Sequence, residues 1–213
     1  MNERLTELGC EEFTERLAAR ESVPGGGGAA ALAGALAAAL CSMAGNFTLG
    51  NPRFADVADD VRRILEDADD VRYRLLELVE EDAEGFAPLA AAYALPRDDP
   101  RRHEEIQRAT KGACMAPLAM MGECCRAVVL LEQMGERCSR LLESDVASGA
   151  LLVRGALACA SVNVFVNTSA LEDRTIAGRI EATAEELLSE FSLRAERLAA
   201  RMVGRVRGEE SHG

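Results

Sequence analysis

The most regular hydrophobic pattern in the chain lies between residues 57 and 78. Apolar residues recur there in alternating steps of four and three, which keeps them on one face of a helix. The pattern therefore predicts one long helix over about 55–85, extending to about residue 94. Its apolar face carries Val57, Val61, Ile64, Ala68, Val71, Leu75 and Leu78.

The next position in this series is occupied by Asp82. A carboxylate among core side chains costs several kcal/mol unless it is paired or functional. Such burial shifts the pKa of a carboxyl group and suits it to proton transfer. Two structural alternatives stand beside this interpretation: Asp82 pairs with an arginine, or the helix ends before it.

Other segments predict further helices, with loops at 46–52 and 96–100. No alternating strand pattern of useful length occurs. The expected fold is therefore all-α, a bundle of long antiparallel helices in a single domain over 1–213, with a disordered tail at 207–213. The further helices are predicted over 2–20, 29–45, from about 101 with a kink or restart at Pro117, 146–167 and 172–206.

Some of these helices carry more specific signals. Ala30, Gly34, Ala38 and Ser42 place a small residue at every fourth position, which lets a neighbouring helix approach closely. The pair Ser144-Asp145 is an N-cap signal for the helix that follows it. A second heptad-like seam is predicted from Met120, Cys124, Ala127, Leu131, Met134, Cys138 and Leu141.

The formal net charge of −12 over 213 residues narrows the range of partners. Phosphate binding needs a basic surface, so neither nucleic acid nor an anionic membrane is expected as a partner. The apolar run 29–44 is too short and too rich in alanine to span a membrane. The polar first residues do not resemble a signal peptide, and a cytoplasmic location is expected.

Cysteine and histidine usage gives little support for metal or nucleophile sites. The seven cysteines include no CxxC pair, and most lie in apolar helical segments, as expected for small core residues in a reducing compartment. His103 and His212 are the only histidines. They are too few for a histidine-based zinc site or a histidine-activated nucleophile.

Besides Asp82, two polar features are candidates for chemistry. The run Gly25–Gly28 leads into a helix N-terminus that could hold an anion or a carbonyl oxygen, or it is a turn where helices pack tightly. Asn163 and Asn167 share a helix face and either bond to each other across helices or line a polar pocket. Lys111 and Asp145 are also polar, but Lys111 is more simply explained as a surface cation and Asp145 as a helix cap.

Taken together, the motifs resemble those of a known family. The segment SVPGGGGAAALAGALAAALCSMAGNFTLGNPRF is similar to the amino-terminal signature of the cyclodeaminase/cyclohydrolase family of folate enzymes. In that signature, a Pro-Gly-Gly-Gly loop and a small-residue helix precede Asn-x-Thr-x-Gly, here ending at Gly50. Similar in the same order, and within a resemblance that covers about residues 8–200, are EDAEGFAPLAAAYALP, ATKGACMAPL and SDVASGALLVRGALACASVNVFVN.

The chain departs from the family pattern at three positions. Gly28 stands where the family commonly has serine, and Arg53-Phe54 stands where it commonly has Lys-Tyr. A hydroxyl and an ammonium group are therefore replaced in segments that the resemblance places near the pocket. These departures bear on which reaction the chain catalyses.

The resemblance implies an all-helical homodimer that acts on tetrahydrofolate carrying a one-carbon unit between N5 and N10. Because the chain begins at this domain, without the transferase domain of the bifunctional enzymes, a methenyltetrahydrofolate cyclohydrolase is preferred. The alternative reaction is that of formiminotetrahydrofolate cyclodeaminase, which closes the formimino group and releases ammonia. A non-catalytic folate-binding helical dimer and a ligand-free scaffold are the other classes. No metal or redox cofactor is implied.

The resemblance also implies roles for individual residues. Asp82 is expected to act as general acid or base. Asn163 and Asn167 are expected to orient the pterin or to hold the attacking water, and Arg53 and Lys111 to meet the anionic glutamate tail. The glycine run is expected to meet a folate carboxylate or the developing charge. The expected substrate-binding set is Pro24, Gly25, Gly26, Gly27, Gly28, Asn46, Thr48, Arg53, Lys111, Asp145, Asn163 and Asn167.

Overall fold

A computed structural model describes residues 4–49 and 51–209, and every regular element in this part of the chain is helical. This confirms the all-α prediction. The predictions that concern Gly50, His212 and the last residues of the tail lie outside the described part. In chain order the elements are η1 (Leu5–Glu7), α1 (Cys10–Ala18), α2 (Gly26–Leu49), η2 (Pro52–Val57), α3 (Ala58–Ala94), α4 (Arg102–Ala113), α5 (Met115–Arg137), η3 (Arg140–Leu142), α6 (Glu143–Ser169) and α7 (Arg174–Val206).

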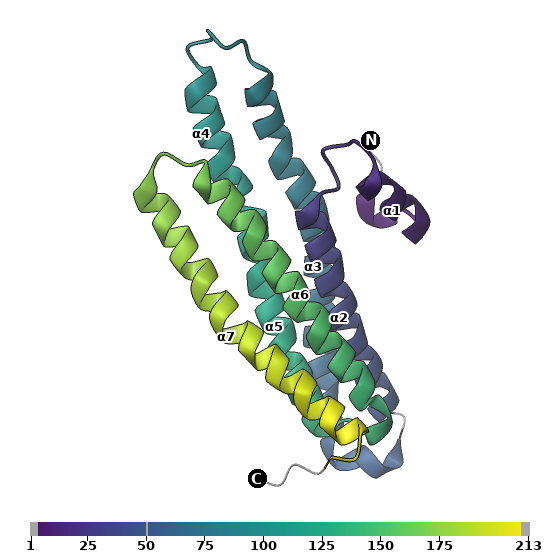
Figure 1. The fold of residues 1–213 in the computed structure, drawn as a ribbon. Helices are drawn as coiled ribbons and strands as arrows, with labels where there is room; N and C mark the ends of the chain where they lie inside the picture. The colour runs from purple at the N-terminus through teal and green to yellow at the C-terminus, as the bar shows by residue number, and fades with distance from the viewer. Residues whose placement is uncertain (1–3, 50, 210–213) are drawn as a thin grey trace.

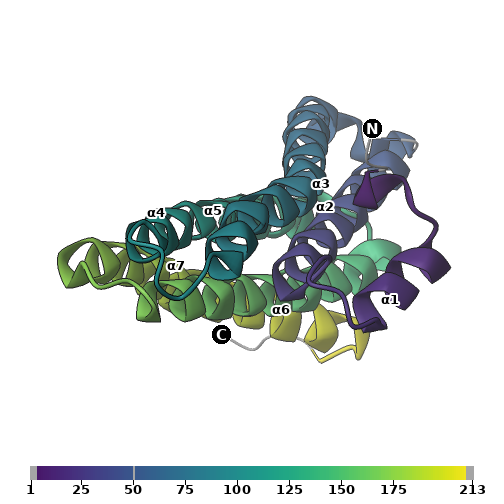
Figure 2. The same ribbon diagram turned by 90° about the horizontal axis from the view of Figure 1, so that it is seen from above.

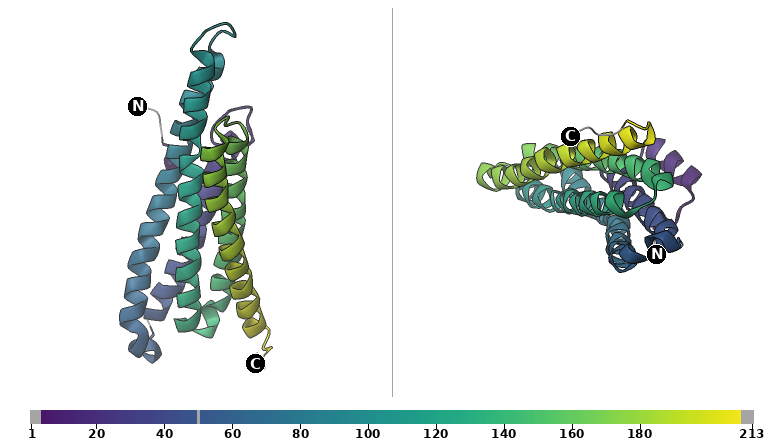
Figure 3. Two further views of the ribbon diagram at one scale, coloured as in Figure 1. Left: turned by 90° about the vertical axis from the view of Figure 1, so that its left-hand side faces the viewer. Right: turned by 90° about the horizontal axis from the view of Figure 1, so that it is seen from below.

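The long helices lie side by side in an elongated bundle (Figures 1 and 3). Helix α2 packs between α3 and α6, and α5 packs against α3, α6 and α7. The end of α3 and helix α4 extend beyond the other helices at one end of the bundle, and the short α1 projects from its side (Figures 1 and 2). The Gly25–Gly28 turn lies toward this end, because α2 begins there.

Helix α3 is a single helix of 37 residues, and its apolar seam faces the core as predicted. Val61, Val71, Leu75 and Leu78 are fully buried. The helix continues past Asp82 and through Pro88 to Ala94. The alternative that the helix ends before Asp82 is therefore wrong.

Helix α2 is longer than the sequence pattern indicates. It begins at Gly26 rather than near residue 29, and it continues through Asn46 to Leu49. The close approach predicted from its small residues is confirmed. A β-carbon at Gly34 would lie 3.1 Å from Leu75 Cδ1 and 3.2 Å from Cys124 Sγ, so α3 and α5 both pack directly on the α2 backbone.

Four local predictions are wrong. Residues 2–20 are not one helix, because the chain breaks at Gly9 between η1 and α1. The restart near Pro117 occurs earlier, at Cys114. Asp145 does not cap α6, which begins at Glu143 with no capping side chain. Leu141 is 88% exposed in η3 instead of continuing the seam of α5.

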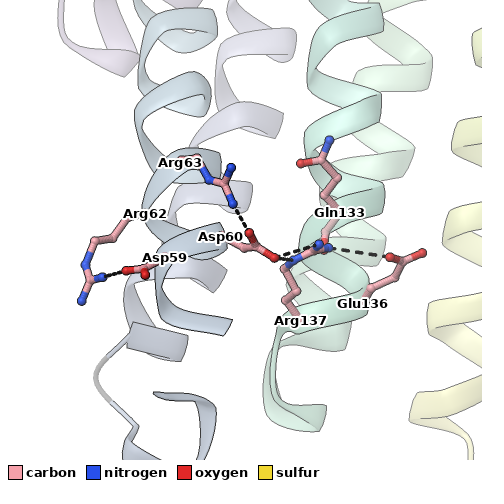
Figure 4. A network of polar contacts seen from close by, with 7 residues as sticks. All are labelled: Asp59, Asp60, Arg62, Arg63, Gln133, Glu136 and Arg137. Atoms are coloured by element: carbon pink, nitrogen blue, oxygen red, sulfur yellow. Dashed lines mark hydrogen bonds and ion pairs between the residues drawn. The ribbon is translucent and has the colours of Figure 1, made fainter. Parts of the chain in front are cut away.

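A polar network joins α3 to α5 at the opposite end of the bundle from the glycine turn (Figure 4). Arg137 Nη2 lies 3.2 Å from Asp60 Oδ2, and Arg137 Nη1 donates to the carbonyl oxygen of Gln133 at 3.0 Å. Asp60 also accepts from Arg63. The hydrogen bond from Arg137 is the main cause of the lowered pKa of Asp60. The network links the two helices at this end.

Within the described residues, three stretches are long and apolar enough to cross a membrane by length and composition, namely Gly26–Leu49, Arg102–Arg137 and Arg140–Ser169. They correspond to α2, to α4 with α5, and to η3 with α6. In each stretch, between 44% and 56% of the most apolar 18-residue segment is buried inside the bundle. Much of their apolar character therefore serves the protein core, and the remainder lies on the surface.

Candidate active site

The glycine turn leads into α2 with Pro24 buried beneath it. The first turn of a helix has N–H groups without partners inside the helix, and the helix dipole makes this end positive. Gly26, Gly27 and Gly28 form this first turn. The predicted donors are therefore part of a helix terminus and not of a flexible loop.

The side chain of Asp82 lies against this helix terminus. A β-carbon at Gly27 would clash with Asp82 Oδ1 and lie only 2.5 Å from Oδ2. The backbone N–H of Gly28 donates a hydrogen bond to the same carboxyl group. Only glycine at position 27 leaves room for the carboxyl group in this place. At Gly28, in contrast, a β-carbon would meet Pro24 and Val79 at ordinary distances of 3.5 and 3.6 Å.

Burial raises the pKa of Asp82, and the hydrogen bond from Gly28 opposes this shift only in part. Within residues 4–49 and 51–209, no arginine or lysine forms an ion pair with Asp82. This part of the structure therefore does not support the alternative in which Asp82 pairs with an arginine. The side chain is half-buried, whereas Leu78 and Val79 below it are fully buried. Asp82 thus lies at the open end of the apolar seam and not inside it.

The two asparagines on α6 approach the same end of α2. A β-carbon at Gly26 would lie 3.6 Å from Asn163 Nδ2. Asn163 Nδ2 donates to the backbone carbonyl of Cys159 at 2.9 Å, and Asn167 Nδ2 donates to that of Ala113 at 2.9 Å. The amides therefore do not bond to each other. Their side-chain carbonyl oxygens accept no hydrogen bond from the described residues, which leaves them available to a ligand.

Lys111 belongs to the same region. It lies in the last turn of α4, two residues before Ala113, and its side chain is exposed. The bond from Asn167 to Ala113 holds this end of α4 beside α6. Helices α2, α3, α4 and α6 therefore each contribute predicted residues to one end of the bundle.

Four predicted residues do not reach this site within one chain. Asn46 and Thr48 lie in the last turns of α2, which is about 35 Å long for its 24 residues, and Arg53 follows in η2. Thr48 is buried and donates to the carbonyl of Ala44. Asp145 lies 18 residues before Asn163 on α6, which corresponds to about 27 Å. Asn46, Thr48 and Arg53 belong to the same motif as the glycine run, and Asp145 to the same motif as Asn163, so each of these two continuous motifs extends along the length of a helix.

A cavity of about 890 Å³ lies beside the site, between the N-terminal segment and α3. It includes Val23 from the turn before α2, and Glu81 and Ala83 on either side of Asp82. Asp82 itself does not line it. Carboxylates outnumber guanidinium groups in its lining, which disfavours an anionic ligand. The charged lining residues are Glu21, Glu77, Glu80, Glu81, Glu84, Arg4 and Arg16.

Sequence reasoning missed Glu80. Its carboxylate accepts from the backbone N–H groups of Leu5 and Thr6, at 3.2 and 2.9 Å, and from the Thr6 hydroxyl at 2.9 Å. These bonds attach the segment before the glycine turn to α3, next to Asp82. A charged residue on the outer face of a helix gives no sequence signal for this role.

No group of three or more metal-binding side chains (histidine, cysteine, aspartate or glutamate) gathers in the described part of the chain. His103, the one histidine in this part, contacts Glu172 through Nε2 at 3.1 Å on the surface. The polar groups at the candidate site are thus one carboxyl, two amides, the N–H groups of a helix terminus and one ammonium group. This set can move protons, orient a polar ligand and attract an anion.

Comparison with known proteins places this arrangement in a family. A sequence model of the formiminotransferase-cyclodeaminase family matches residues 9–186, and the chain belongs to this family. The resemblance seen in the motifs is thereby confirmed.

Individual relatives carry two enzyme names. The chain is 35% identical over 192 residues to methenyltetrahydrofolate cyclohydrolase of Methylorubrum extorquens, a match that covers 88% of this chain and 92% of that protein. It is 27% identical over 195 residues to formimidoyltransferase-cyclodeaminase of Rattus norvegicus, covering 90% of this chain but 36% of that longer protein. The crystal structure of formiminotetrahydrofolate cyclodeaminase from Thermotoga maritima superposes with a TM-score of 0.81 at 28% identity, covering 95% of this chain and 97% of that one.

Proposed function

We propose that this protein is a folate enzyme that acts on the one-carbon bridge between N5 and N10 of tetrahydrofolate, with methenyltetrahydrofolate cyclohydrolase as the preferred activity. The similarity to the cyclohydrolase of Methylorubrum extorquens supports this, because it extends over 92% of that protein. The observation that carries the chemistry is the half-buried Asp82 carboxyl group, which lies against the first turn of α2 and has a raised pKa.

In the proposed reaction, a water oxygen attacks the methenyl carbon while Asp82 takes one proton from that water. The bond from this carbon to N5 then breaks as the hydroxyl becomes a carbonyl group. N5 receives the proton held by Asp82, and the hydroxyl proton leaves to solvent. Charge and atoms balance, because the cationic methenyl substrate and one water give a neutral formyl group on N10, an N–H at N5 and one released proton. General acid–base catalysis of this kind accelerates a reaction by about 10²–10⁴-fold.

We assign supporting roles to the neighbouring groups. Asn163 and Asn167 orient the pterin or hold the attacking water through their free carbonyl oxygens. Lys111 attracts the glutamate tail at the edge of the site. The glycine N–H groups that Asp82 does not use stabilise developing negative charge. The roles of Asn46, Thr48, Arg53 and Asp145 in substrate binding stay predictions that a single chain does not support.

The cyclodeaminase reaction is the second candidate. The observation that favours it is the structural likeness to the Thermotoga maritima enzyme over nearly the whole of both chains. The same carboxyl group would protonate the departing amine as the ring closes, and ammonia would leave in place of water addition. We further propose that the protein is a cytoplasmic homodimer, needs no metal or redox cofactor and acts without nucleic acid or membrane partners.

A paired assay on purified protein tests these proposals. The first arm follows the decay of methenyltetrahydrofolate absorbance against the buffer rate, and the second follows ammonia release from formiminotetrahydrofolate. Enzymatic decay in the first arm without ammonia in the second supports the cyclohydrolase, and the reverse result supports the cyclodeaminase. Loss of both signals with retained folate binding in calorimetry would identify a non-catalytic folate-binding protein.

A further inference from the structure

The turn of α3 that follows Asp82 is open, whereas the turn that precedes it is covered. On a helix surface, a residue has as neighbours the residues three and four positions away on either side. On the N-terminal side of Asp82 these are Leu78 and Val79, which are fully buried. On its C-terminal side they are Gly85 and Phe86, which are both only half-buried. The environment of the seam therefore changes at Asp82.

The surface of this turn has few contacts with other side chains. A β-carbon at Gly85 would meet nothing within 4 Å, so the described residues leave open space over this position. Among these residues, Phe86 packs against neither cluster of buried apolar side chains, whereas the half-buried Phe165 and Phe191 pack against the larger one. An aromatic ring normally contributes its large apolar area to a core or an interface. The Phe86 ring is thus available to a ligand.

Two helices set the limits of the opening. Helix α2 begins at Gly26, and its first turn reaches α3 at Asp82. Further along α3, Leu89 and Ala92 are buried again, in the part of the helix that pairs with α4 (Figure 1). The helix rises by about 10 Å over the seven residues from Asp82 to Leu89. An opening of this length can accept a flat bicyclic ring.

The position of Phe86 suits a ring that reacts at Asp82. Side chains four residues apart on a helix have β-carbons about 5–6 Å apart, and stacked rings have centroids about 4.5–7 Å apart. A flat ring that lies on Phe86 therefore brings its edge to the Asp82 carboxyl group. Building on the proposed function, we infer that Phe86 stacks on the pterin ring of the folate, in the opening over Gly85, and so presents N5 to Asp82.

The polar groups at this end of the bundle favour the pterin over the aminobenzoyl ring of the folate. The side-chain oxygens of Asn163 and Asn167 can only accept hydrogen bonds. The pterin ring has N–H groups to donate, whereas the aminobenzoyl ring has none once its nitrogen, N10, is part of the one-carbon bridge. N5 also belongs to the pterin ring. The aminobenzoyl ring is therefore an outcome of the test and not part of the proposal.

Binding of 5-formyltetrahydrofolate, a stable folate with the same reduced pterin ring, tests the role of the aromatic face. In Phe86→Leu, the apolar bulk is kept and the aromatic face is lost, so the affinity measured by calorimetry should fall about tenfold to a hundredfold. Phe86→Tyr keeps the ring and should restore the affinity. The matched control is Phe191→Leu on α7, where a half-buried ring packs on the core. This control should bind as wild type does.

Gly85 provides a steric test of the same opening. In Gly85→Leu, the new side chain would occupy the space beside Phe86, and the affinity for 5-formyltetrahydrofolate should fall at least tenfold. The control is Gly178→Leu on α7, because a β-carbon there would also meet nothing within 4 Å. Circular dichroism verifies that both variants stay helical. Equal affinities of the two variants would show that the ring does not lie over Gly85.

Steady-state kinetics separate ring binding from proton transfer. Stacking is present in the bound substrate and in the transition state, so F86L should raise KM for methenyltetrahydrofolate by about the factor lost in affinity. The value of kcat should fall by less than KM rises. A loss of kcat at unchanged KM and unchanged affinity would show that Phe86 supports Asp82 and does not bind the ring.

A fluorescence measurement identifies the ring without any turnover. The chain contains no tryptophan, so Phe86→Trp gives a single reporter at the opening. Saturable quenching is expected with 5-formyltetrahydrofolate and with 6-methyltetrahydropterin, which has the pterin ring alone. The control is Tyr73→Trp, at a side chain 59% exposed on the same helix, which neither compound should quench. Quenching of F86W by p-aminobenzoylglutamate instead of the pterin, or by none of the three compounds, would overturn the inference.

The two proposals can fail separately. A wild-type protein that converts either folate, with KM and affinity unchanged in F86L, would overturn the inference and leave the proposed function standing. Quenching of F86W by the pterin, with weakened binding in F86L but no turnover by wild type, would support the inference and contradict the proposed enzyme activity. A wild-type protein that binds no folate would contradict both.

Discussion

Two opposing influences act on the carboxyl group of Asp82. Burial beside Leu78 and Val79 favours the neutral form, and the N–H of Gly28 at the positive end of α2 favours the charged form. Burial dominates, so the pKa of Asp82 lies above its ordinary value. A carboxyl group in this balance exchanges its proton more readily near neutral pH than a surface aspartate does.

The first prediction concerns Asp82→Asn. The amide keeps the size of the side chain and still accepts from Gly28, but it cannot take a proton. Turnover of methenyltetrahydrofolate should fall by about 10²–10⁴-fold while folate binding persists. The variant should be at least as stable as wild type at neutral pH in thermal unfolding, because no charge is buried. Full activity in D82N would show that another group carries the proton.

The raised pKa of Asp82 also predicts a pH dependence. Acting as a base, the carboxyl must be ionised, so kcat/KM should fall as pH decreases through a pKa above the usual aspartate value of about 3.9. The folded state binds this proton more tightly than the unfolded state. The stability of wild type relative to D82N should therefore decrease as pH rises between the two pKa values. An acid limb that persists unchanged in D82N would contradict this assignment.

Gly27 gives the sharpest steric prediction. In Gly27→Ala, the new methyl group would displace the Asp82 carboxyl from Gly28, and a shift of this size should lower activity by about 10²-fold. The control is Gly122→Ala in the interior of α5, where a β-carbon would meet nothing within 4 Å. That variant should keep wild-type activity and gain about 0.5–1 kcal/mol in urea unfolding. Equal activity of the two variants would disprove the close approach of Asp82.

At the scale of elements, the boundaries of α2 were the least predictable. Glycine disfavours helix, so the pattern indicates a start after Gly28, near residue 29. The helix begins at Gly26 because tertiary contacts compensate: Asp82 accepts from its first turn, and Asn163 packs on Gly26. Seams with many core residues, as in α3, were predicted well, because their burial depends on local periodicity alone.

The attachment of the N-terminal segment to α3 gives a prediction for Glu80. In Glu80→Ala, the N–H groups of Leu5 and Thr6 lose their acceptor, which should cost about 1–3 kcal/mol in urea unfolding. Tryptic cleavage after Arg20 should become faster. The control is Glu77→Ala on the same helix, which loses only the ion pair with Arg74. If cleavage is equally fast in both variants, Glu80 does not hold the segment.

At the scale of the whole molecule, the cysteines report on the core. Burial raises the pKa of Cys41 and Cys125 to about 12, and it also raises the pKa of Cys124. These thiols should therefore alkylate only when the bundle unfolds. Pulsed labelling across a urea titration should give one transition for all three, coincident with loss of helicity, while Cys10 labels throughout. Labelling before that transition would show that the bundle opens locally.

Local patterns along the chain are sufficient to establish the class of this protein. Helical periodicity depends on neighbours three and four residues away, so it predicts helices, seams and a carboxylate, Asp82, at a seam position without knowledge of the fold. The motifs also identified the family. Which motif residues come together depends on how the helices pack. This packing brings Asp82 and Asn163 to the start of α2 and leaves Arg53 beyond its other end. A straight helix places its two ends a full helix length apart, even when both belong to one sequence motif.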